Sequence, residues 1–414
     1  MVEQTCPYFG ECGGCQIQDL DYAEQLDLKR KELGETFRSF WAGPIEMIPS
    51  PDIWHYRNKV DPSFGRKWYP EPPSADFERE SVLGFKCRGQ WRRLLDIREC
   101  RIAPQGFDAL VNVVRDWMHE HDLRTCDTRS HRGFLRCLLV RVGKRTGQRM
   151  VVLITSEGSF DQSRSFVDTV QAVFPSTLIA RGISRRSVEG AFADELETLH
   201  GGDAIEERLE IADGEDRRSL RFHISPFGFF QTNSAAAERL YALVRRWVRA
   251  VAPRYVYDLY GGAGAIALTC ADLVEHVWSV DNAPDTIDDG EHNVGMNQVE
   301  NITFALEKVK NYLLVRLTEG GLPDGSAAIV DPSRAGVHPK ALRRLIDLSP
   351  PDILYVSCNP GNLARELPHF LKKYGLVDVR AVDLFPHTKH IEAVAWLSLR
   401  KDARRDSWKA ISLE

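Results

Sequence analysis

A cysteine lies directly after a short apolar stretch near the end of the chain. Residues 353–356 read Ile-Leu-Tyr-Val, which has the length and composition of a buried strand. Cys358 follows, ahead of a turn at 359–361 that contains proline and glycine. Free cysteines are more often small buried residues than nucleophiles. However, α/β proteins place their chemistry at the carboxyl ends of strands, so a nucleophilic Cys358 is a hypothesis that the rest of the chain must support.

Two carboxylates and a glycine turn follow other predicted strands. Asp281 and Asp331 each end an apolar stretch, and Gly262 and Gly264 form a turn after an earlier one. A glycine turn followed by an acid at the end of the next strand predicts a nucleotide site in which the acid binds the ribose hydroxyls. This pattern alone is typical of both NAD and S-adenosylmethionine. No lysine and serine complete a phosphate loop here, so ATP or GTP is not expected.

Three cysteines are grouped near the N-terminus. Cys6, Cys12 and Cys15 form the pattern C-x5-C-x2-C, and no histidine accompanies them. Such thiolate sets suit an iron–sulfur cluster or zinc and need a fourth ligand from elsewhere. Cys87 and Cys100 are the candidates, and we favour Cys100 because it opens a new segment after a strand-like stretch. An odd total of nine cysteines without a visible secretory signal argues against a disulfide framework.

The elements that position these residues fall into three regions. At 414 residues the chain is long enough for two or three domains. We expect 1–105 to hold the cysteine segment and the first part of a central domain, and 106–223 to complete that β-rich domain. Residues 224–414 alternate strands with helices, which predicts a doubly wound parallel sheet, the catalytic α/β domain. Its strands are expected at 255–259, 277–281, 327–331, 353–356 and 393–399.

Two long helices are also expected. One covers 234–251 at the start of the C-terminal region, and the other covers 22–41. The pattern of the second is amphipathic, with an apolar face and a charged face. Its expected inward residues are Leu26, Leu33 and Phe37, and its expected outward residues are Lys29, Arg30 and Lys31.

Charge and hydropathy place limits on the class of protein. The net charge is −5, so the total charge does not indicate a nucleic-acid partner, but basic stretches such as 129–149 could guide a polyanion. A solvated surface explains the same stretch equally well. No apolar run is long enough to span a membrane and no secretory signal is visible, so we expect a cytoplasmic protein, and a monomer, without a membrane partner.

Several motifs occur together in a fixed order along the chain. They are C-x5-C-G-G-C at 6–15, F-G-F-F-Q-T-N at 227–233, D-L-Y-G-G-A-G at 258–264, D-P-S-R-A-G at 331–336, S-C-N-P at 357–360 and H-x-E at 390–392. Together they resemble the RNA uracil-5-methyltransferase family, whose members make 5-methyluridine in ribosomal or transfer RNA. The resemblance covers most of the chain.

The resemblance implies a class I methyltransferase fold with S-adenosylmethionine as donor and an RNA uridine as substrate. It implies that Cys358 is the nucleophile and Glu392 the base. The cofactor and target-base site would be lined by Gln231, Tyr260, Gly262, Gly264, Asp281 and Asp331. A [4Fe–4S] cluster would be held by Cys6, Cys12, Cys15 and Cys100. Because this cluster accompanies mainly the ribosomal enzymes, 23S ribosomal RNA is the expected substrate, and transfer RNA is the alternative.

The chemistry explains these residue types. Carbon 5 of uracil is a poor nucleophile until a thiolate adds to carbon 6, and a base must then remove the proton from carbon 5. Cysteine provides an accessible thiolate and leaves readily, and a glutamate can accept the proton. The target base must leave its stack to reach such residues. With no further domain ahead of the cysteines, we expect RNA capture to rest on the central domain, particularly its basic strands at 129–149.

The chain departs from the family pattern near the cofactor. Ala265 follows the glycine turn where a polar residue is usual, Ser333 replaces a proline, and Ala305 follows Phe304 where an aspartate is common. These changes concern cofactor affinity more than reaction type. A non-catalytic RNA-binding protein of the same fold is therefore a second hypothesis. An NAD-linked oxidoreductase is a third, but it explains neither Cys358 nor the four-cysteine set.

Overall fold

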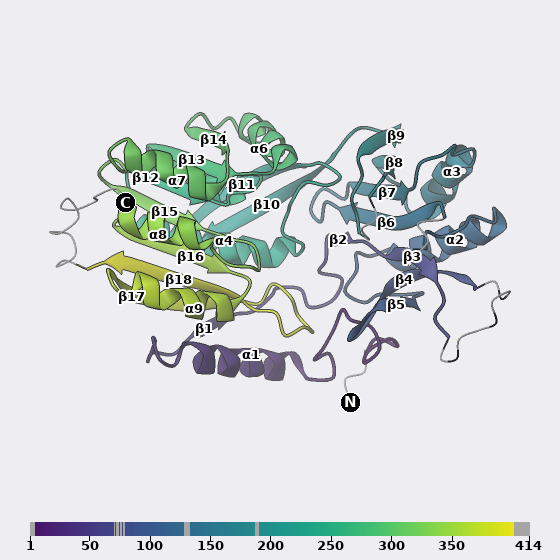
Figure 1. Cartoon of the computed structure of the whole chain (residues 1–414), viewed down its shortest axis with the longest axis horizontal. Helices are drawn as coiled ribbons and strands as arrows, with labels where there is room; N and C mark the ends of the chain where they lie inside the picture. Colours follow the sequence, from purple (N-terminus) through teal and green to yellow (C-terminus); the bar gives the residue numbers. More distant parts are fainter. Residues whose placement is uncertain are drawn as a thin grey trace.

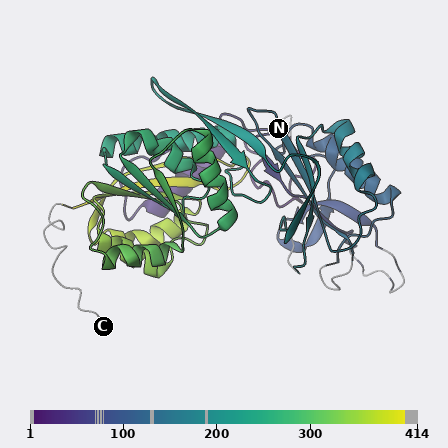
Figure 2. The ribbon, with the colours of Figure 1, turned by 90° about the horizontal axis from the view of Figure 1, so that it is seen from above.

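The computed structural model describes residues 5–400 except 70, 72–73, 75–76, 78, 128–132 and 187–189. The chain forms two lobes, each built around one sheet, and a long two-stranded ribbon runs between them (Figures 1 and 2). Within the described residues, no helix combines the length and apolar composition that crossing a bilayer requires.

The C-terminal lobe contains an eight-stranded sheet with the order β1-β17-β18-β16-β15-β12-β13-β14. Its strands from the second half of the chain are β12 (Tyr255–Leu259), β13 (His276–Asp281), β14 (Ile302–Leu306), β15 (Ser326–Val330), β16 (Asp352–Ser357), β17 (Tyr374–Val382) and β18 (Glu392–Leu399). The predicted α/β fold is confirmed, but the sheet is mixed rather than parallel. β18 lies antiparallel to both β16 and β17, because the chain turns back after β17 and inserts between the two.

Helices cover both faces of this sheet. One face packs on α4 (Ser234–Val251) and α5 (Ala265–Cys270), which a short 3₁₀ turn (Ala271–Leu273) follows, and α6 (Pro284–Met296) lies beside them. The other face packs on α7 (Val309–Thr318), α8 (Pro339–Leu348) and α9 (Pro360–Phe370). We call the core on the α4 side the first hydrophobic core and the core on the α7–α9 side the second. Successive residues of a strand point to opposite faces, so Val256 lies in the first hydrophobic core and Tyr257 in the second.

The N-terminal lobe contains a second sheet with the order β5-β4-β3-β6-β7-β8-β9, and β2 pairs with β6. Its strands are β2 (Lys59–Val60), β3 (Ser63–Arg66), β4 (Ser81–Cys87), β5 (Gln90–Asp96), β6 (Leu135–Val142), β7 (Arg149–Thr155), β8 (Leu178–Ile183) and β9 (Glu195–Gly201). Helices α2 (Phe107–Glu120) and α3 (Ser163–Val173) cover one face. The β-rich central region is as predicted.

The two lobes share one hydrophobic core. The second face of the N-terminal sheet packs on a ribbon of β10 (Ile205–Asp213) and β11 (Asp216–Ile224), and the ribbon packs on α4. Apolar side chains such as Leu139 and Val152 therefore belong to the same cluster as Leu240 and Val244. This continuity fixes the position of one sheet relative to the other.

The first helix and strand of the chain belong to the C-terminal lobe. Helix α1 (Tyr22–Phe37) packs near α9, and β1 (Glu46–Ile48) pairs in parallel with β17 at the edge of the sheet (Figure 1). The segment that we expected to lie with the central domain thus crosses to the catalytic sheet. Three residues of β1 carry too little pattern to reveal a partner more than 300 residues away.

The prediction that Lys29 points outward is wrong. Gln25, Lys29 and Leu33 recur every fourth residue and form the buried side of α1. The Lys29 Nζ atom lies 2.7 Å from Asp383 Oδ1, and both side chains are buried. A lysine with a buried carboxylate partner can occupy the inner face of a helix, which an amphipathic pattern does not anticipate. Arg30 and Lys31 are exposed, as expected.

Candidate active site

Cys358 and Glu392 lie opposite each other at one end of the sheet. In the antiparallel pairing of β16 with β18, Ser357 is opposite Ala393, so the next position on each chain brings Cys358 level with Glu392. Glu392 is buried and Cys358 is half-buried. Asn359 caps the following helix α9 by accepting a hydrogen bond from the Asn362 amide, which ends the strand just after the thiol.

Asp331 belongs to the same group of acids. It follows β15, the neighbour of β16, and its amide donates to Leu259 O at 3.2 Å. Burial and the Asp258 carboxylate raise the pKa of Asp331 to about 7. Burial and Asp331 also raise the pKa of Glu392 well above its usual range, although the Arg334 guanidinium opposes this shift. Each carboxylate charge disfavours ionisation of the neighbouring acid. A cationic ligand would offset this repulsion, so the group of acids favours such a ligand.

The Cys358 thiol shares this environment. Burial raises its pKa to about 11, and the Glu392 and Asp331 carboxylates contribute in the same direction, whereas Arg334 lowers it. The free site therefore holds a thiol rather than a thiolate at neutral pH. A thiol opposite a carboxyl group suits addition to an electron-poor double bond followed by removal of a proton.

The glycine turn and Asp281 lie beside this edge. Asp281 Oδ2 accepts from the Gly262 amide at 3.2 Å, and Oδ1 accepts from Asn282 N at 2.7 Å and Ala283 N at 3.0 Å. These bonds fix the carboxylate at the end of β13. Gly264 has φ +77°, and a Cβ there would lie 2.8 Å from the Phe304 ring, so the position requires glycine.

Tyr260 precedes the glycine turn in an unusual backbone conformation. Its φ is +65°, a left-handed value that non-glycine residues rarely adopt. Burial raises the pKa of its phenol to about 12, and a backbone hydrogen bond from His338 opposes the shift. Tyr260 is half-buried beside the second hydrophobic core. Such backbone strain is common at ligand sites.

The loop that carries Gln231 is held from the N-terminal lobe. Asn58 Nδ2 donates to Gln231 O at 2.7 Å and to Ser234 Oγ at 2.9 Å, and the Arg141 guanidinium donates to Gly228 O. The loop packs beside the glycine turn, since the Phe229 ring lies 3.8 Å from a Cβ built on Gly262. These contacts depend on how the lobes meet, so no local pattern predicts them.

The two aromatic residues of this loop differ. Phe230 is buried in the hydrophobic core that the two lobes share. Phe229 is 60% exposed, although it contacts the glycine turn region. An exposed aromatic ring beside a binding site is available for stacking.

A cavity of about 350 Å³ opens beside Cys358. Helix α1 contributes Glu32, Leu33 and Thr36 to its lining, which also includes Arg334, Asn359 and residues 389–391. The contribution of α1 was not predicted, because nothing in its pattern indicates a site.

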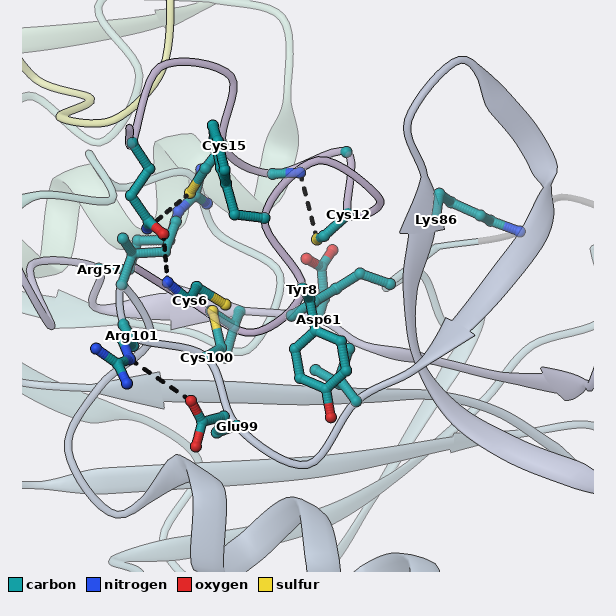
Figure 3. A pocket seen from close by; sticks show the side chains of 18 residues that line it. Cys6, Tyr8, Cys12, Cys15, Arg57, Asp61, Lys86, Glu99, Cys100 and Arg101 are labelled. Carbon is teal, nitrogen blue, oxygen red and sulfur yellow. Dashed lines mark hydrogen bonds and ion pairs between the residues drawn. The ribbon is translucent and has the colours of Figure 1, made fainter. Parts of the chain in front are cut away.

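The four N-terminal cysteines that we assigned to one metal site line one cavity of about 280 Å³. Figure 3 shows the thiols of Cys6, Cys12, Cys15 and Cys100 around this space. Cys87 does not line the cavity. Its backbone pairs with the backbone of Cys12 in an isolated β-bridge. Burial and the neighbouring thiols raise the pKa of Cys15 to about 12 and that of Cys100 to about 11. Four half-buried thiols that line one cavity favour a cationic partner.

The arrangement does not match a site for one metal ion. Among the residues that the structure describes, no three histidine, cysteine or acidic side chains are grouped to hold a metal ion. A four-iron cluster binds each thiolate through a different iron, so its sulfurs stand farther apart than those around a single ion. The donor set, four thiols that line one cavity, is of the chemical kind that such a cluster takes.

The basic stretch 129–149 is not a free RNA surface where it is described. Arg141 is buried, Lys144 Nζ donates to His55 O at 2.7 Å, and the Arg145 guanidinium pairs with Glu238 at 2.7 Å. The guanidinium of Arg136 donates to Ser184 O at 3.1 Å. Long basic side chains here join segments of the protein, which their charge alone does not reveal. Arg129, His131 and Arg132 lie outside the described residues.

Comparisons with protein families, with curated proteins and with solved structures all match this chain to RNA methyltransferases. Residues 193–400 match the family model described as tRNA (Uracil-5-)-methyltransferase. An uncharacterized RNA methyltransferase of Staphylococcus epidermidis is 32% identical over 408 residues, covering 97% of this chain and 84% of the relative. One of Caldanaerobacter subterraneus is 33% identical over 406 residues, covering 96% and 85%.

A solved structure matches both lobes. It is the tRNA (uracil-54, C5)-methyltransferase of Pyrococcus abyssi in complex with S-adenosyl-L-homocysteine, with a TM-score of 0.72 and 28% identity, covering 96% of this chain and 88% of that one. The match confirms the class I methyltransferase fold that the motifs led us to expect. The chain is an RNA methyltransferase and belongs to the tRNA (uracil-5-)-methyltransferase family.

Proposed function

We propose that the protein methylates carbon 5 of a specific uridine in RNA through a covalent bond between Cys358 and the uracil ring. The observation that carries this proposal is the strand register that brings Cys358 level with Glu392 at the end of the sheet. A nucleophile and a base must both reach one bound ring, and this pairing provides them from adjacent strands.

The proposed reaction begins with the Cys358 thiolate, which forms when the thiol of the free site releases its proton to solvent. Its sulfur bonds to carbon 6, and the electrons of the carbon 5–carbon 6 double bond move toward the carbonyl at carbon 4. Carbon 5 then bonds to the methyl group as the bond between that methyl and the positively charged sulfur of the donor breaks, which leaves the donor sulfur as a neutral thioether. Glu392 removes the proton from carbon 5, the double bond reforms, and the carbon 6–sulfur bond breaks to release the thiolate.

S-adenosylmethionine would supply the methyl group on a positively charged sulfur. Gly262 and Gly264 would let the backbone approach it, Asp281 would accept its ribose hydroxyls, and Gln231, Tyr260 and Asp331 would line the rest of the site. The acidic group around Asp331 supports a cationic ligand, since its carboxyl groups resist joint ionisation without one. The Pyrococcus abyssi enzyme, in complex with S-adenosyl-L-homocysteine, supports the same donor.

We propose that Cys6, Cys12, Cys15 and Cys100 hold a [4Fe–4S] cluster. Support comes from the cavity that the four thiols share and from their chemistry, since thiolates are the usual ligands of such clusters. Protein purified without oxygen should contain about four irons per chain and lose them in a Cys100→Ser variant but not in Cys87→Ser. One zinc per chain and no iron would refute the assignment.

The proposed substrate is 23S ribosomal RNA, because the cysteine set accompanies ribosomal enzymes in this family. Transfer RNA is the second candidate, and the Pyrococcus abyssi enzyme favours it, since that enzyme is a tRNA (uracil-54, C5)-methyltransferase. Mass-spectrometric mapping of 5-methyluridine in both RNAs from a deletion strain decides between them. The missing nucleotide should return with the normal gene and not with Cys358→Ala. If no 5-methyluridine is lost, the proposal fails.

Calorimetry with S-adenosylmethionine tests the proposed donor directly. Saturable binding that a Gly264→Ala change weakens supports the proposed cofactor site. Absence of binding by the folded protein would refute it.

A further inference from the structure

The segment that leads into Glu392 is held from the N-terminal end of the chain. Residues 383–391 connect β17 to β18, and Glu392 follows as the first residue of β18. Lys29 Nζ from α1 donates to Asp383 Oδ1 at 2.7 Å and to Phe385 O at 3.1 Å. Asp383 Oδ1 also accepts from the Phe385 amide at 3.1 Å. We call residues 383–391 the base loop. The buried amine of Lys29 therefore fixes the start of the base loop.

His387 is the most restrained residue of the base loop. Gln25 Oε1 accepts from the His387 amide at 2.8 Å, and Gln25 Nε2 donates to His387 Nδ1 at 3.1 Å. His387 Nε2 lies 2.9 Å from Ile53 O, and its ring stacks on Trp54 with centroids 4.0 Å apart. Since an amide nitrogen can only donate, Nδ1 is the acceptor and Nε2 carries the proton. These contacts hold a left-handed backbone, with φ +67°.

The cysteine segment holds the same residue from its other side. The amides of Gln16 and Ile17 both donate to His387 O, at 2.9 and 3.1 Å. Gln16 Oε1 also accepts from the Lys389 amide at 3.3 Å. Gln16 directly follows Cys15, whose thiol lines the cysteine cavity. Cys15, which lines the cysteine cavity, is therefore joined by one peptide bond to Gln16, which holds the base loop.

We propose that Gln25, Lys29 and His387 are positioning residues that hold Glu392 opposite Cys358, and that the cysteine segment belongs to the same support. Occupation of the cysteine cavity then stiffens the base loop by fixing Cys15 and, through it, the two amides on His387. This inference rests on the proposed function, because it takes Glu392 as the base that removes the proton from carbon 5.

The proposal separates two parts of the reaction. Cys358 is held by the end of β16 and the start of α9, neither of which contains these contacts. Addition of the thiolate and methyl transfer should therefore survive a loosened base loop. Removal of the proton should not, because a base displaced by about 1 Å loses much of its rate. The predicted signature is a methylated RNA that stays covalently attached to Cys358.

The first test compares substitutions on one helix. Gln25→Ala and Lys29→Met should increase the lifetime of the covalent protein–RNA complex by roughly tenfold to a hundredfold, measured on denaturing gels with S-adenosylmethionine and substrate RNA. Lys31→Met is the matched control, since Lys31 is exposed on the same helix, and it should leave the lifetime unchanged. Glu392→Gln serves as the reference that traps the complex fully.

The outcomes distinguish the two levels of the proposal. If Glu392→Gln traps no complex, the base assignment in the proposed function fails. If Glu392→Gln traps it but the Gln25 and Lys29 variants turn over like the control, the positioning inference is wrong. Loss of adduct formation together with loss of RNA binding would indicate a merely structural role and would also overturn it.

A second test needs no substitution. Hydrogen exchange of a peptide covering 383–391 is compared between protein reconstituted with iron and sulfide and the same protein after metal removal. Removal should speed exchange of the His387 and Lys389 amides and leave a peptide from α6 unchanged. Equal exchange of the base loop in both samples would refute the coupling to the cysteine segment.

Discussion

The Lys29 ammonium and the Asp383 carboxylate form a buried ion pair across 354 residues of sequence, with Nζ 2.7 Å from Oδ1. The side chains are 1% and 0% exposed. Each charge offsets the cost of burying the other, so the pair makes the position of α1 dependent on the loop before Glu392. Removing one partner leaves an uncompensated charge inside the protein.

We predict that Lys29→Met lowers the free energy of unfolding by about 3 to 5 kcal/mol. Thermal or urea unfolding followed by circular dichroism measures the change. Arg30→Ala is the control, because the Arg30–Asp27 pair on the same helix is solvent-exposed and should contribute less than about 1 kcal/mol. A double variant, Lys29→Met with Asp383→Leu, should recover part of the loss. Equal effects of the Lys29 and Arg30 changes would contradict the importance of the buried pair.

Cys358→Ala should abolish methylation while leaving the binding of RNA and S-adenosylmethionine intact. The reason is that no other thiol lines the cavity at the end of β16. Incorporation of a labelled methyl group into RNA measures the effect. Cys126→Ala is the matched control, since Cys126 is also half-buried but lines neither the cysteine cavity nor the one beside Cys358. Methylation that survives Cys358→Ala would remove the residue from the reaction.

The reactivity of the Cys358 thiol should rise with pH and with the loss of a neighbouring charge. Its pKa is raised to about 11 by burial and by the carboxylates of Glu392 and Asp331. A negative neighbour disfavours the thiolate, so Glu392→Gln should lower the pKa and speed alkylation by iodoacetamide between about pH 8 and 10. Peptide-resolved mass spectrometry follows this residue alone. Slower alkylation in the variant would mean that Glu392 does not act on the thiol.

Gly264→Ala should weaken binding of S-adenosylmethionine and lower stability by about 1 to 2 kcal/mol, because the position has φ +77° and a Cβ would meet the Phe304 ring at 2.8 Å. Calorimetry and thermal unfolding measure the two effects. Gly295→Ala in α6 is the control: its Cβ would meet nothing within 4 Å, and alanine favours a helix. If both variants bind alike, the turn does not approach the cofactor.

The sequence predicted the strand ends well, because an apolar stretch followed by a turn is a local signal. Asp281 is the last residue of its strand, and Asp331 and Cys358 directly follow strands of the same sheet, as expected. The edge strand β14 and strand β17 were missed, because their burial is partial and their apolar pattern is weak. The antiparallel insertion of β18, which sets the distance between Cys358 and Glu392, depends on pairing that no local pattern records.

The basic residues show a second limit. Charge predicted that Lys29 and Arg141 would face solvent, and both are buried with oxygen partners. Their long apolar stems make burial possible once a carboxylate or carbonyl is available. Those partners come from segments far away in the sequence, so only the fold identifies them. The roles of Gln25 and α1 beside the site were not predicted for the same reason.

The edge strand β1 has a consequence for how this protein can be made and divided. The family model spans 193–400, yet the sheet in that span is completed by residues 46–48, and the face of α9 is covered by α1. A fragment of residues 193–400 would expose the unpaired edge of β17 and part of the second hydrophobic core. Such exposed edges and apolar surfaces promote aggregation. During synthesis α1 and β1 lack their partners α9 and β17 until almost the whole chain has left the ribosome. The order of translation and the order of folding are therefore reversed for this segment.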